Sequence, residues 1–462
     1  MHDPSSTPPV WNALLHTASP VMKAPSPLCR VLCGSREDVA KCARFAVEHK
    51  LPIVARGSGH QYGGLCLAEG ALVVDMSRLK RVEVDVESGT ALVEPGVNTL
   101  ELRNATQPYG LHFPGGHISP VGISGFILGG GNGWGTRLFG AAVDNVVSME
   151  VVLATEDGCS LTQVDHLTHT ELFAGLKGAG AFLGLVTQFT VSLHPVPAEI
   201  PCITAIFPLA AADQVGAFFR PFYEACPQSV EPSMAFTCTS PEDGNRPIVI
   251  ISCSAFAADC PEIQECYNEL RALLPSKRIV LHDGLLPLGS ALGMLDAGWD
   301  WPGLCLYGHG MFVATKSLEG EALRQIVRHA TDMTSPRASV CLILAPPNPS
   351  AHRSLLLVCP SAPSSTDLHG SSLSYRDCLF VVAYSMWPRT SAGPEADGDV
   401  AHAAWVSSAR EALQPVVLGC YMNEVMHDRP GQIESCYSQA TLAGLRQLKL
   451  KVDPHGLLRP LR

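Results

Sequence analysis

The stretch Arg56-Gly57-Ser58-Gly59-His60 stands between two apolar runs, residues 51–55 and 71–75, that we expect to be strands. Short apolar runs bounded by glycine are typical of buried strands joined by a tight loop. Backbone N–H groups in such a loop can bind a phosphate, because a glycine has no Cβ atom to keep the ligand away. We therefore interpret this stretch as a candidate phosphate-binding loop.

A second glycine-rich stretch follows, Val121-Gly122-Ile123-Ser124-Gly125-Phe126-Ile127-Leu128-Gly129-Gly130-Gly131-Asn132-Gly133. Two loops of this kind favour one large phosphate-bearing cofactor. Taken singly, each is as consistent with ordinary turns, and a lone histidine is often only a hydrogen-bonded core residue. The cofactor hypothesis therefore depends on the two loops together.

The order of these motifs, followed by Asp144-Asn145-Val146, resembles the FAD-linked oxidases of the berberine-bridge-enzyme-like group, within the vanillyl-alcohol-oxidase superfamily. Ser35 reads as the N-cap of an amphipathic helix that leads into the first strand, as in the family. Segments 172–190, 421–424 and 453–458 are also similar to family segments. The resemblance covers residues 29–196 and 416–462 well, and the middle only by length and coarse pattern.

The resemblance implies an α+β fold. Residues 1–198 would form a PCMH-type FAD-binding domain of two subdomains, residues 199–415 a substrate-binding domain with an antiparallel sheet backed by helices, and residues 416–462 a C-terminal segment that returns to the FAD-binding domain. In the middle, the pattern predicts strands at 202–207, 248–252, 340–344 and 379–384, helices at 211–223, 261–274 and 319–333, and loops at 346–349, 361–372 and 389–398.

FAD is the cofactor that the resemblance implies. The residues expected to bind it are Arg56, Gly57, Ser58, Gly59, His60, Gly122, Gly125, Gly129, Gly130, Gly131, Gly133, Asn145, Val146, Gly184, Val186, Tyr421 and Asn423. The glycines could equally be turn residues, and the two valines could be core strand residues. We expect the Ser58 side chain to contribute little, and a branched residue at Gly130 or Gly131 to abolish cofactor binding.

His60 is the expected point of covalent attachment. In the family, the histidine at this position commonly carries a bond to the isoalloxazine ring, and bicovalent members add a cysteine at the position that is Ile118 here. His117, beside it, cannot supply the missing thiolate. The sequence therefore supports at most a single link through His60, and a loop-bracing hydrogen bond is the alternative role for this residue.

Tyr421 is the expected catalytic residue, because the tyrosine of the Tyr-x-Asn segment takes a substrate proton in relatives. The alternative is a buried tyrosine whose hydroxyl is only a structural hydrogen-bond partner. Glu424, Tyr384 and Trp387 are secondary candidates for the substrate pocket.

Two departures from the family pattern keep two functions open. The family's Gly-Gly-Asn-Phe-Gly reads Gly180-Ala181-Phe182-Leu183-Gly184, and its late Asn-Tyr pair reads Ala440-Thr441, so groups that hydrogen-bond near the flavin are lost. One function is an FAD-dependent oxidase of a small organic substrate in secondary metabolism, with O2 as electron acceptor. The other is a non-redox cyclase that keeps the fold. A sugar oxidase fits less well, because the chain has only 6 tryptophans for an aromatic groove.

Charge and cysteine pattern exclude other classes. A net charge of -11 without basic clusters argues against nucleic acid or an anionic membrane as partner. The 17 cysteines form no CxxC pair, so we expect no metal site and mostly buried thiols in a reducing compartment. The first residues carry no basic and apolar signal pattern, and the cytoplasm is the expected location.

Overall fold

The computed structural model describes the chain in twelve stretches, residues 25–155, 158–239, 243–275, 278–296, 304–314, 321–333, 335, 339–344, 370–376, 378–388, 397–426 and 429–459. The expected loop at 346–349 and most of those at 361–372 and 389–398 lie outside these residues; residues 370–372 have no regular structure, whereas 397 and 398 begin a helix and are not in a loop.

A small parallel sheet and a covering helix begin the fold. The sheet has the order β1-β3-β2, with β1 at Cys29–Leu32, β2 at Ile53–Arg56 and β3 at Leu72–Asp75. Helix α2 spans Arg36–His49, and the Ser35 side chain accepts the N–H of Asp38, which confirms the expected N-cap. Its buried face, which includes Val39 and Ala43, packs between this sheet and the next.

The second sheet is antiparallel and has five strands in the order β4-β5-β9-β7-β8. The strands span Val82–Asp85 (β4), Thr90–Val93 (β5), Val146–Thr155 (β7), Gly158–Asp165 (β8) and Leu185–Ser192 (β9). A two-stranded ribbon joins Leu111–His112 (β6) to His194–Pro195 (β10). The helices of this part are α3 (Thr99–Thr106), α4 (Ile123–Leu128), α5 (Thr136–Phe139) and α6 (Thr170–Leu176).

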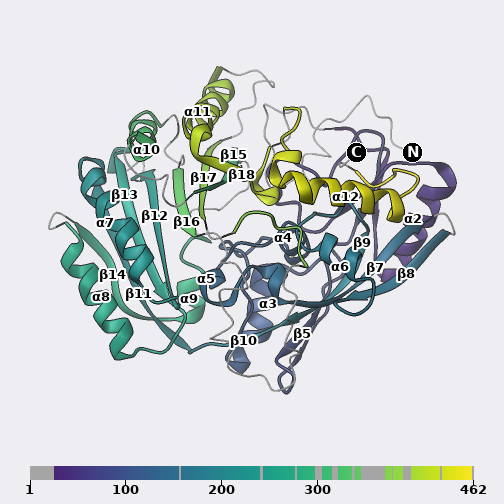
Figure 1. The fold of residues 1–462 in the computed structure, drawn as a ribbon, viewed down its shortest axis with the longest axis horizontal. Coiled ribbons are helices and arrows are strands. Elements are labelled where there is room, and N and C mark those ends of the chain that lie inside the picture. Colours follow the sequence, from purple (N-terminus) through teal and green to yellow (C-terminus); the bar gives the residue numbers. More distant parts are fainter. Residues whose placement is uncertain are drawn as a thin grey trace.

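An antiparallel sheet of eight strands forms the other half of the molecule, at the left and top of Figure 1. Its order is β14-β11-β13-β12-β16-β17-β15-β18, with bounds Glu199–Pro208 (β11), Val230–Cys238 (β12), Pro247–Ala255 (β13), Ile279–Pro287 (β14), Leu304–Val313 (β15), Ser339–Leu344 (β16), Leu379–Pro388 (β17) and Val417–Cys420 (β18). The helices of this half are α7 (Ala212–Ala225), α8 (Pro261–Leu273), α9 (Leu288–Leu292), α10 (Glu321–Thr331) and α11 (Asp397–Leu413).

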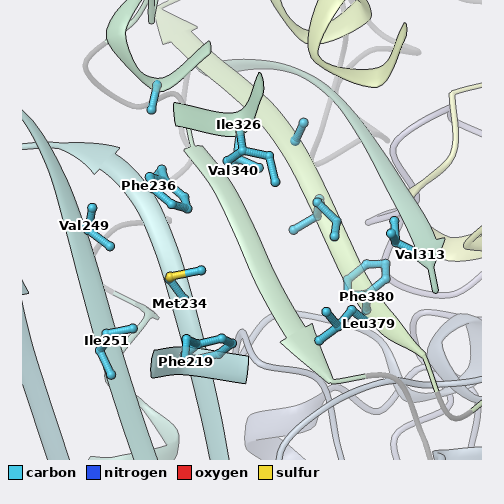
Figure 2. Packing of buried hydrophobic residues seen from close by; sticks show 14 of the residues in the cluster. Phe219, Met234, Phe236, Val249, Ile251, Val313, Ile326, Val340, Leu379 and Phe380 are labelled. Carbon is cyan, nitrogen blue, oxygen red and sulfur yellow. The ribbon is translucent and has the colours of Figure 1, made fainter. Parts of the chain in front are cut away.

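One hydrophobic cluster joins this sheet to its helices. Figure 2 shows Phe219 of α7 and Ile326 of α10 among side chains from β12, β13, β16 and β17. Burial of such a surface is the main force that holds helices on a sheet. The expected α+β fold, with an antiparallel sheet backed by helices, is confirmed.

The end of the chain contacts both halves. Strand β18 pairs with β15 in the eight-stranded sheet, whereas helix α12 (Gln439–Val452) packs against α6 and β7. Leu458 then forms a bridge beside Ile53 of β2. The domain boundaries themselves stay a prediction, and the described residues beyond 416 contact both halves.

The expected elements of the middle segment are present, with ends shifted by a few residues. Strands β11, β13, β16 and β17 and helices α7, α8 and α10 contain or overlap the predicted ranges. Helices α4, α11 and α12 were not expected. In α4 the glycines hid the helix, because isolated glycines lower helix propensity and their pattern resembles that of a loop.

Asp75 is a buried carboxylate that supports the first loop. Its side chain is 0% exposed and lies 2.7 Å from Arg30 and 3.0 Å from Arg56. Arg56 also donates to the carbonyl oxygens of Gly57 and Ser58. The carboxylate therefore fixes the guanidinium group that in turn holds the loop backbone.

We expect Asp75→Asn to lower the free energy of unfolding by about 3–5 kcal/mol, because it leaves two guanidinium groups around an uncharged amide. The midpoint of urea unfolding measures the loss. Lys451→Gln is the control, since it breaks a pair with Glu171 in which both side chains are 62% exposed, and such pairs contribute less than about 1 kcal/mol. Equal midpoints for the two variants would contradict the bracing role of Asp75.

Candidate functional site

A cavity of about 200 Å³ lies where the two glycine-rich stretches meet the C-terminal segment. Its walls come from four parts of the chain that are far apart in sequence. The lining residues are Ala55, Gly57, Ser58, Gly59, His60, Gln61, Tyr62, Leu65, Cys66, Met76, Gly116, His117, Ile118, Val121, Gly122, Ser124, Gly125, Phe126, Leu128, Asn132, Gly180, Ala181, Phe182, Val186, Tyr421, Met422, Asn423, Glu424 and Arg459.

The two glycine-rich stretches touch each other directly. A Cβ atom on Gly57 would lie 2.7 Å from the Ser124 hydroxyl oxygen, so only glycine permits this approach. The Ser58 hydroxyl oxygen accepts the N–H of Gly122 at 2.8 Å. This hydrogen bond links the two walls of the cavity, and the expectation that the Ser58 side chain contributes little to cofactor binding stays a prediction.

The first stretch presents the expected residues to the cavity. Gly57, Ser58, Gly59 and His60 all line it, and Gly59 has a φ of 82°, in the left-handed region that favours glycine. Gln61 was not predicted, yet its Nε2 donates to the carbonyl oxygens of Met422 and Val425 at 3.2 and 2.8 Å. This side chain ties the loop to the C-terminal segment.

Of the glycines in the second stretch, only the first two line the cavity. Gly122 and Gly125 are in the wall, and a Cβ atom on Gly125 would meet nothing within 4 Å. Residues Gly129, Gly130, Gly131 and Gly133 lie outside the lining. Their contacts with a cofactor stay a prediction.

The glycines at 129–133 have a packing role in the structure. Gly130 and Gly131 have φ values of 114° and 78°, and a Cβ atom on Gly130 would lie 2.9 Å from the side chain of Leu373. A Cβ atom on Gly129 would overlap the amide of Asn423. A branched residue at Gly130 or Gly131 would therefore strain the backbone whether or not a cofactor binds, so such a variant does not report specifically on the cofactor.

Several other predicted cofactor residues have structural partners away from the cavity. Arg56 pairs with Asp75, and the Asn145 amide donates to the carbonyl oxygens of Phe139 and Ala141. Val146 is buried in strand β7, and Gly184 permits close contact with Val151. Of these later residues only Val186 lines the cavity. The burial of Val146 agrees with its alternative role as a core strand residue, and the cofactor contacts of Asn145, Val146 and Gly184 stay a prediction.

The structure also places the secondary candidates for the substrate pocket and the positions at which the sequence departs from the family pattern. Tyr384 and Trp387 lie outside the cavity lining, and the Trp387 indole donates to Asp399 in the core. Ala440 is exposed in the first turn of α12, and Thr441 lies beside it. Of the substituted family positions, Ala181 and Phe182 line the cavity, whereas Ala440 and Thr441 are not among the lining residues. The effect of the substitutions at 440 and 441 on cofactor binding stays a prediction.

Tyr421 is fully buried, with its hydroxyl oxygen pointed at the second glycine-rich stretch. This oxygen accepts the backbone N–H groups of Gly131 and Asn132 at 3.1 and 3.0 Å, and the Asn423 amide nitrogen donates to it at 3.0 Å. Burial raises the pKa of the Tyr421 phenol above its ordinary value, whereas the three donors act against that rise. Its role as the catalytic base stays a prediction.

Two buried polar side chains in the wall lack hydrogen-bond partners in the described part of the chain. They are Asn132, through both amide atoms, and Glu424, through Oε2. Burial raises the pKa of the Glu424 carboxyl to about 8. Buried polar groups are normally hydrogen-bonded, so these atoms indicate a polar ligand in the cavity.

Further residues of the wall were not singled out from the sequence. Asn132 lies inside the second glycine-rich stretch, and Gln61 and Arg459 lie directly after quoted segments, but only folding brings the three together. His117 also lines the cavity, and its Nε2 lies 3.9 Å from Glu231 of β12, whose carboxylate accepts the N–H of Gly135. One edge of the cavity is thus fixed to the eight-stranded sheet.

The residues present fit FAD. The backbone of two glycine-containing walls borders the cavity, the open direction at Gly125 leaves space for a ligand, and the unpaired amide of Asn132 offers both a donor and an acceptor. His60 and Ile118, the positions of the two possible covalent links, both line the cavity. Residues 57–61 and 122–125 would hold the cofactor.

Within the described residues, no helix is long and apolar enough to span a bilayer, and no group of three or more His, Cys, Asp or Glu side chains could hold a metal ion.

Comparison with known sequences supports the cofactor. Residues 27–161 match the model of a family described as FAD binding domain. An uncharacterized FAD-linked oxidoreductase of Bacillus subtilis is 34% identical over 168 residues, which are 36% of this chain and 37% of that protein. The (R)-6-hydroxynicotine oxidase of Paenarthrobacter nicotinovorans is 31% identical over 179 residues, 39% and 38% of the two chains. The chain thus matches less than half of the length of these relatives.

Comparison with solved structures covers nearly the whole chain. The 6-hydroxy-D-nicotine oxidase of Arthrobacter nicotinovorans superposes with a TM-score of 0.80 at 19% identity, covering 99% of this chain and 96% of that one. A berberine bridge enzyme variant gives 0.78 at 18% identity, over 100% and 95%. Residues 27–161 therefore resemble an FAD binding domain, and the chain has the fold of these solved berberine-bridge-enzyme-like structures.

Proposed function

We propose that the protein is an FAD-dependent oxidase that dehydrogenates a small organic substrate, with O2 as electron acceptor, in secondary metabolism. The observation that carries this proposal is the cavity itself, which joins the FAD binding domain to the eight-stranded sheet and contains an unpaired carboxyl group. Relatives named FAD-linked oxidoreductases in Aspergillus ruber and Aspergillus fumigatus support the reaction class. We keep the cytoplasm as the proposed location.

Bound FAD would accept a hydride from the substrate and pass the electrons to dioxygen. The chain's own part is to bind the cofactor between two glycine-containing walls, to exclude water from a mostly apolar cavity, and to exchange a proton with the substrate. Leu65, Met76 and Phe126 supply apolar surface in the wall, and Glu424 and Asn132 supply unpaired polar atoms. A dry site strengthens the electrostatic interactions made inside it.

The alternative is a non-redox cyclase that keeps the fold. It was favoured by substitutions at 182, 440 and 441, and only Phe182 lines the cavity. An anaerobic screen for bleaching of the flavin spectrum tests the oxidase directly, using (R)-6-hydroxynicotine together with a panel of aromatic alcohols and amines. We expect at least one compound to reduce the flavin, and hydrogen peroxide to form when air is admitted. A flavin that no compound bleaches would favour the cyclase.

His60 is proposed to carry the single covalent link to FAD. Acid-precipitated wild-type protein should keep its yellow colour, and precipitated His60→Ala should lose it. Ile118→Ala is the matched control, because it changes the other attachment position without adding a thiolate, and it should retain the colour. Complete loss of flavin from precipitated wild-type protein would disprove the covalent link while leaving FAD binding intact.

Gly125→Leu should reduce flavin content at least ~10-fold while the protein remains folded. The added side chain would enter the cavity, because a Cβ atom there meets no protein atom within 4 Å. Gly444→Leu is the control, since Gly444 also lies in a helix with open space around it but outside the cavity. Flavin absorbance per protein, with circular dichroism as the check on folding, gives the comparison. Full flavin content in Gly125→Leu would show that FAD binds elsewhere.

A further inference from the structure

The hydroxyl oxygen of Tyr421 has no acceptor position left for a substrate. It already receives three N–H donors, from Gly131, Asn132 and Asn423, all at 3.0–3.1 Å. A phenol oxygen has two lone pairs, and even a phenolate oxygen is filled by three donors. Taking a proton from a substrate would therefore require Tyr421 to break one of these hydrogen bonds, and two of them hold the glycine-rich backbone.

The ring of Tyr421 is equally fixed. Phe380 and Phe312 contact it edge to face, with ring centroids 5.2 and 5.7 Å away. The Asn423 amide that donates to Tyr421 also donates to the carbonyl oxygen of Phe126 at 3.0 Å. Tyr421 and Asn423 thus form a rigid connection between the C-terminal segment and the second glycine-rich stretch.

Glu424 differs from Tyr421 in its hydrogen bonding. It ends the short helical turn Met422–Glu424 and lines the cavity, where its Oε2 is buried and has no hydrogen-bond partner among the described residues. Strand β15 makes room for it, because a Cβ atom on Gly310 would lie 2.9 Å from the Glu424 Cβ. Glycine inside a strand commonly marks such a close approach. The position of this carboxyl group therefore depends on both the turn Met422–Glu424 and strand β15.

We propose that the Glu424 carboxyl is the catalytic group that takes the substrate's proton, and that Tyr421 is a positioning residue. This inference rests on the proposed oxidase function. The O–H or N–H proton of an alcohol or amine passes to Oε2 of the carboxylate, and the adjacent C–H hydrogen leaves with its two electrons to FAD. The proton is then released from Glu424 to solvent, so the carboxylate is restored for the next turnover.

The electrostatic setting agrees with a base that works in mildly alkaline solution. Burial raises the pKa of Glu424 to about 8, so roughly a tenth of the carboxyl is ionised at pH 7. No Lys, Arg or His nitrogen lies within 4 Å of this carboxyl in the described residues. The other ionisable groups in the wall are His60, His117, Cys66, Tyr62, Tyr421 and Arg459. The carboxylate fraction, and with it the reduction rate, should rise with pH and level off above about 8.

The first test needs no substrate. Infrared difference spectra of the FAD-loaded protein, recorded between about pH 5 and 10, should show a protonated carboxyl band that disappears with a midpoint near 8. The band should be absent in Glu424→Gln and retained in Tyr421→Phe. A wild-type protein without a carboxyl group that titrates near this pH, or a band that survives in Glu424→Gln, would overturn the assignment.

The second test measures single-turnover flavin reduction with the compound that bleaches wild-type protein fastest in the anaerobic screen. Glu424→Gln should slow reduction at least ~100-fold and remove its pH dependence, with unchanged flavin content. Tyr421→Phe should slow it less than ~10-fold and keep the wild-type pH profile. A larger loss in Tyr421→Phe than in Glu424→Gln would overturn the proposal. If no compound bleaches the wild-type protein, the oxidase function fails, and the infrared titration alone decides whether Glu424 titrates in the cavity.

Discussion

The cavity depends on one close contact, between the amide of Asn423 and the backbone at Gly129. A side chain at residue 129 would occupy the place of this amide, which hydrogen-bonds both Phe126 and Tyr421. Because Asn423 can approach so closely, the C-terminal segment seals one side of the space that the glycine-rich stretches leave open. The same segment contributes β18 to the eight-stranded sheet and α12 to the surface of α6. This close contact is thus one of those that connect the two halves at the site, together with the hydrogen bonds of Tyr421 and Gln61.

A buried charge supports the opposite wall. Asp75 is enclosed by Arg30 and Arg56, and Arg56 holds the carbonyl groups of the first loop. A buried carboxylate is costly unless it is paired and hydrogen-bonded, and here both conditions are met. The charge therefore gives the loop one defined geometry. Glu424 is the contrasting case, because its buried Oε2 has no hydrogen-bond partner in the described chain and burial raises the pKa of its carboxyl.

The difference between paired and unpaired polar groups also separates the residues of the segment Tyr421–Glu424. Its tyrosine and asparagine bond to the protein, whereas its glutamate faces the cavity. The family resemblance favours the tyrosine as the proton acceptor. The number of donors around each oxygen leads to the other choice, because a filled acceptor cannot receive a substrate proton without losing a structural bond.

The sequence by itself determined the strands that flank His60, the N-cap at Ser35, the cofactor class and the α+β fold, because these follow from local pattern and from motifs that are contiguous in the chain. Of the residues that it singled out, His60, Gly122, Gly125 and Tyr421 line one cavity in the structure. The sequence could not distinguish the glycines that line the cavity from those at 129–133 that permit close packing, because the residue type is the same in both roles. Only the tertiary structure decided that Gln61, Asn132, Glu424 and Arg459 share one cavity and that Trp387 and Ala440 lie outside it. The physical reason is that hydrogen-bond saturation and burial are properties of neighbours in space, which residues far apart in the chain acquire only when it folds.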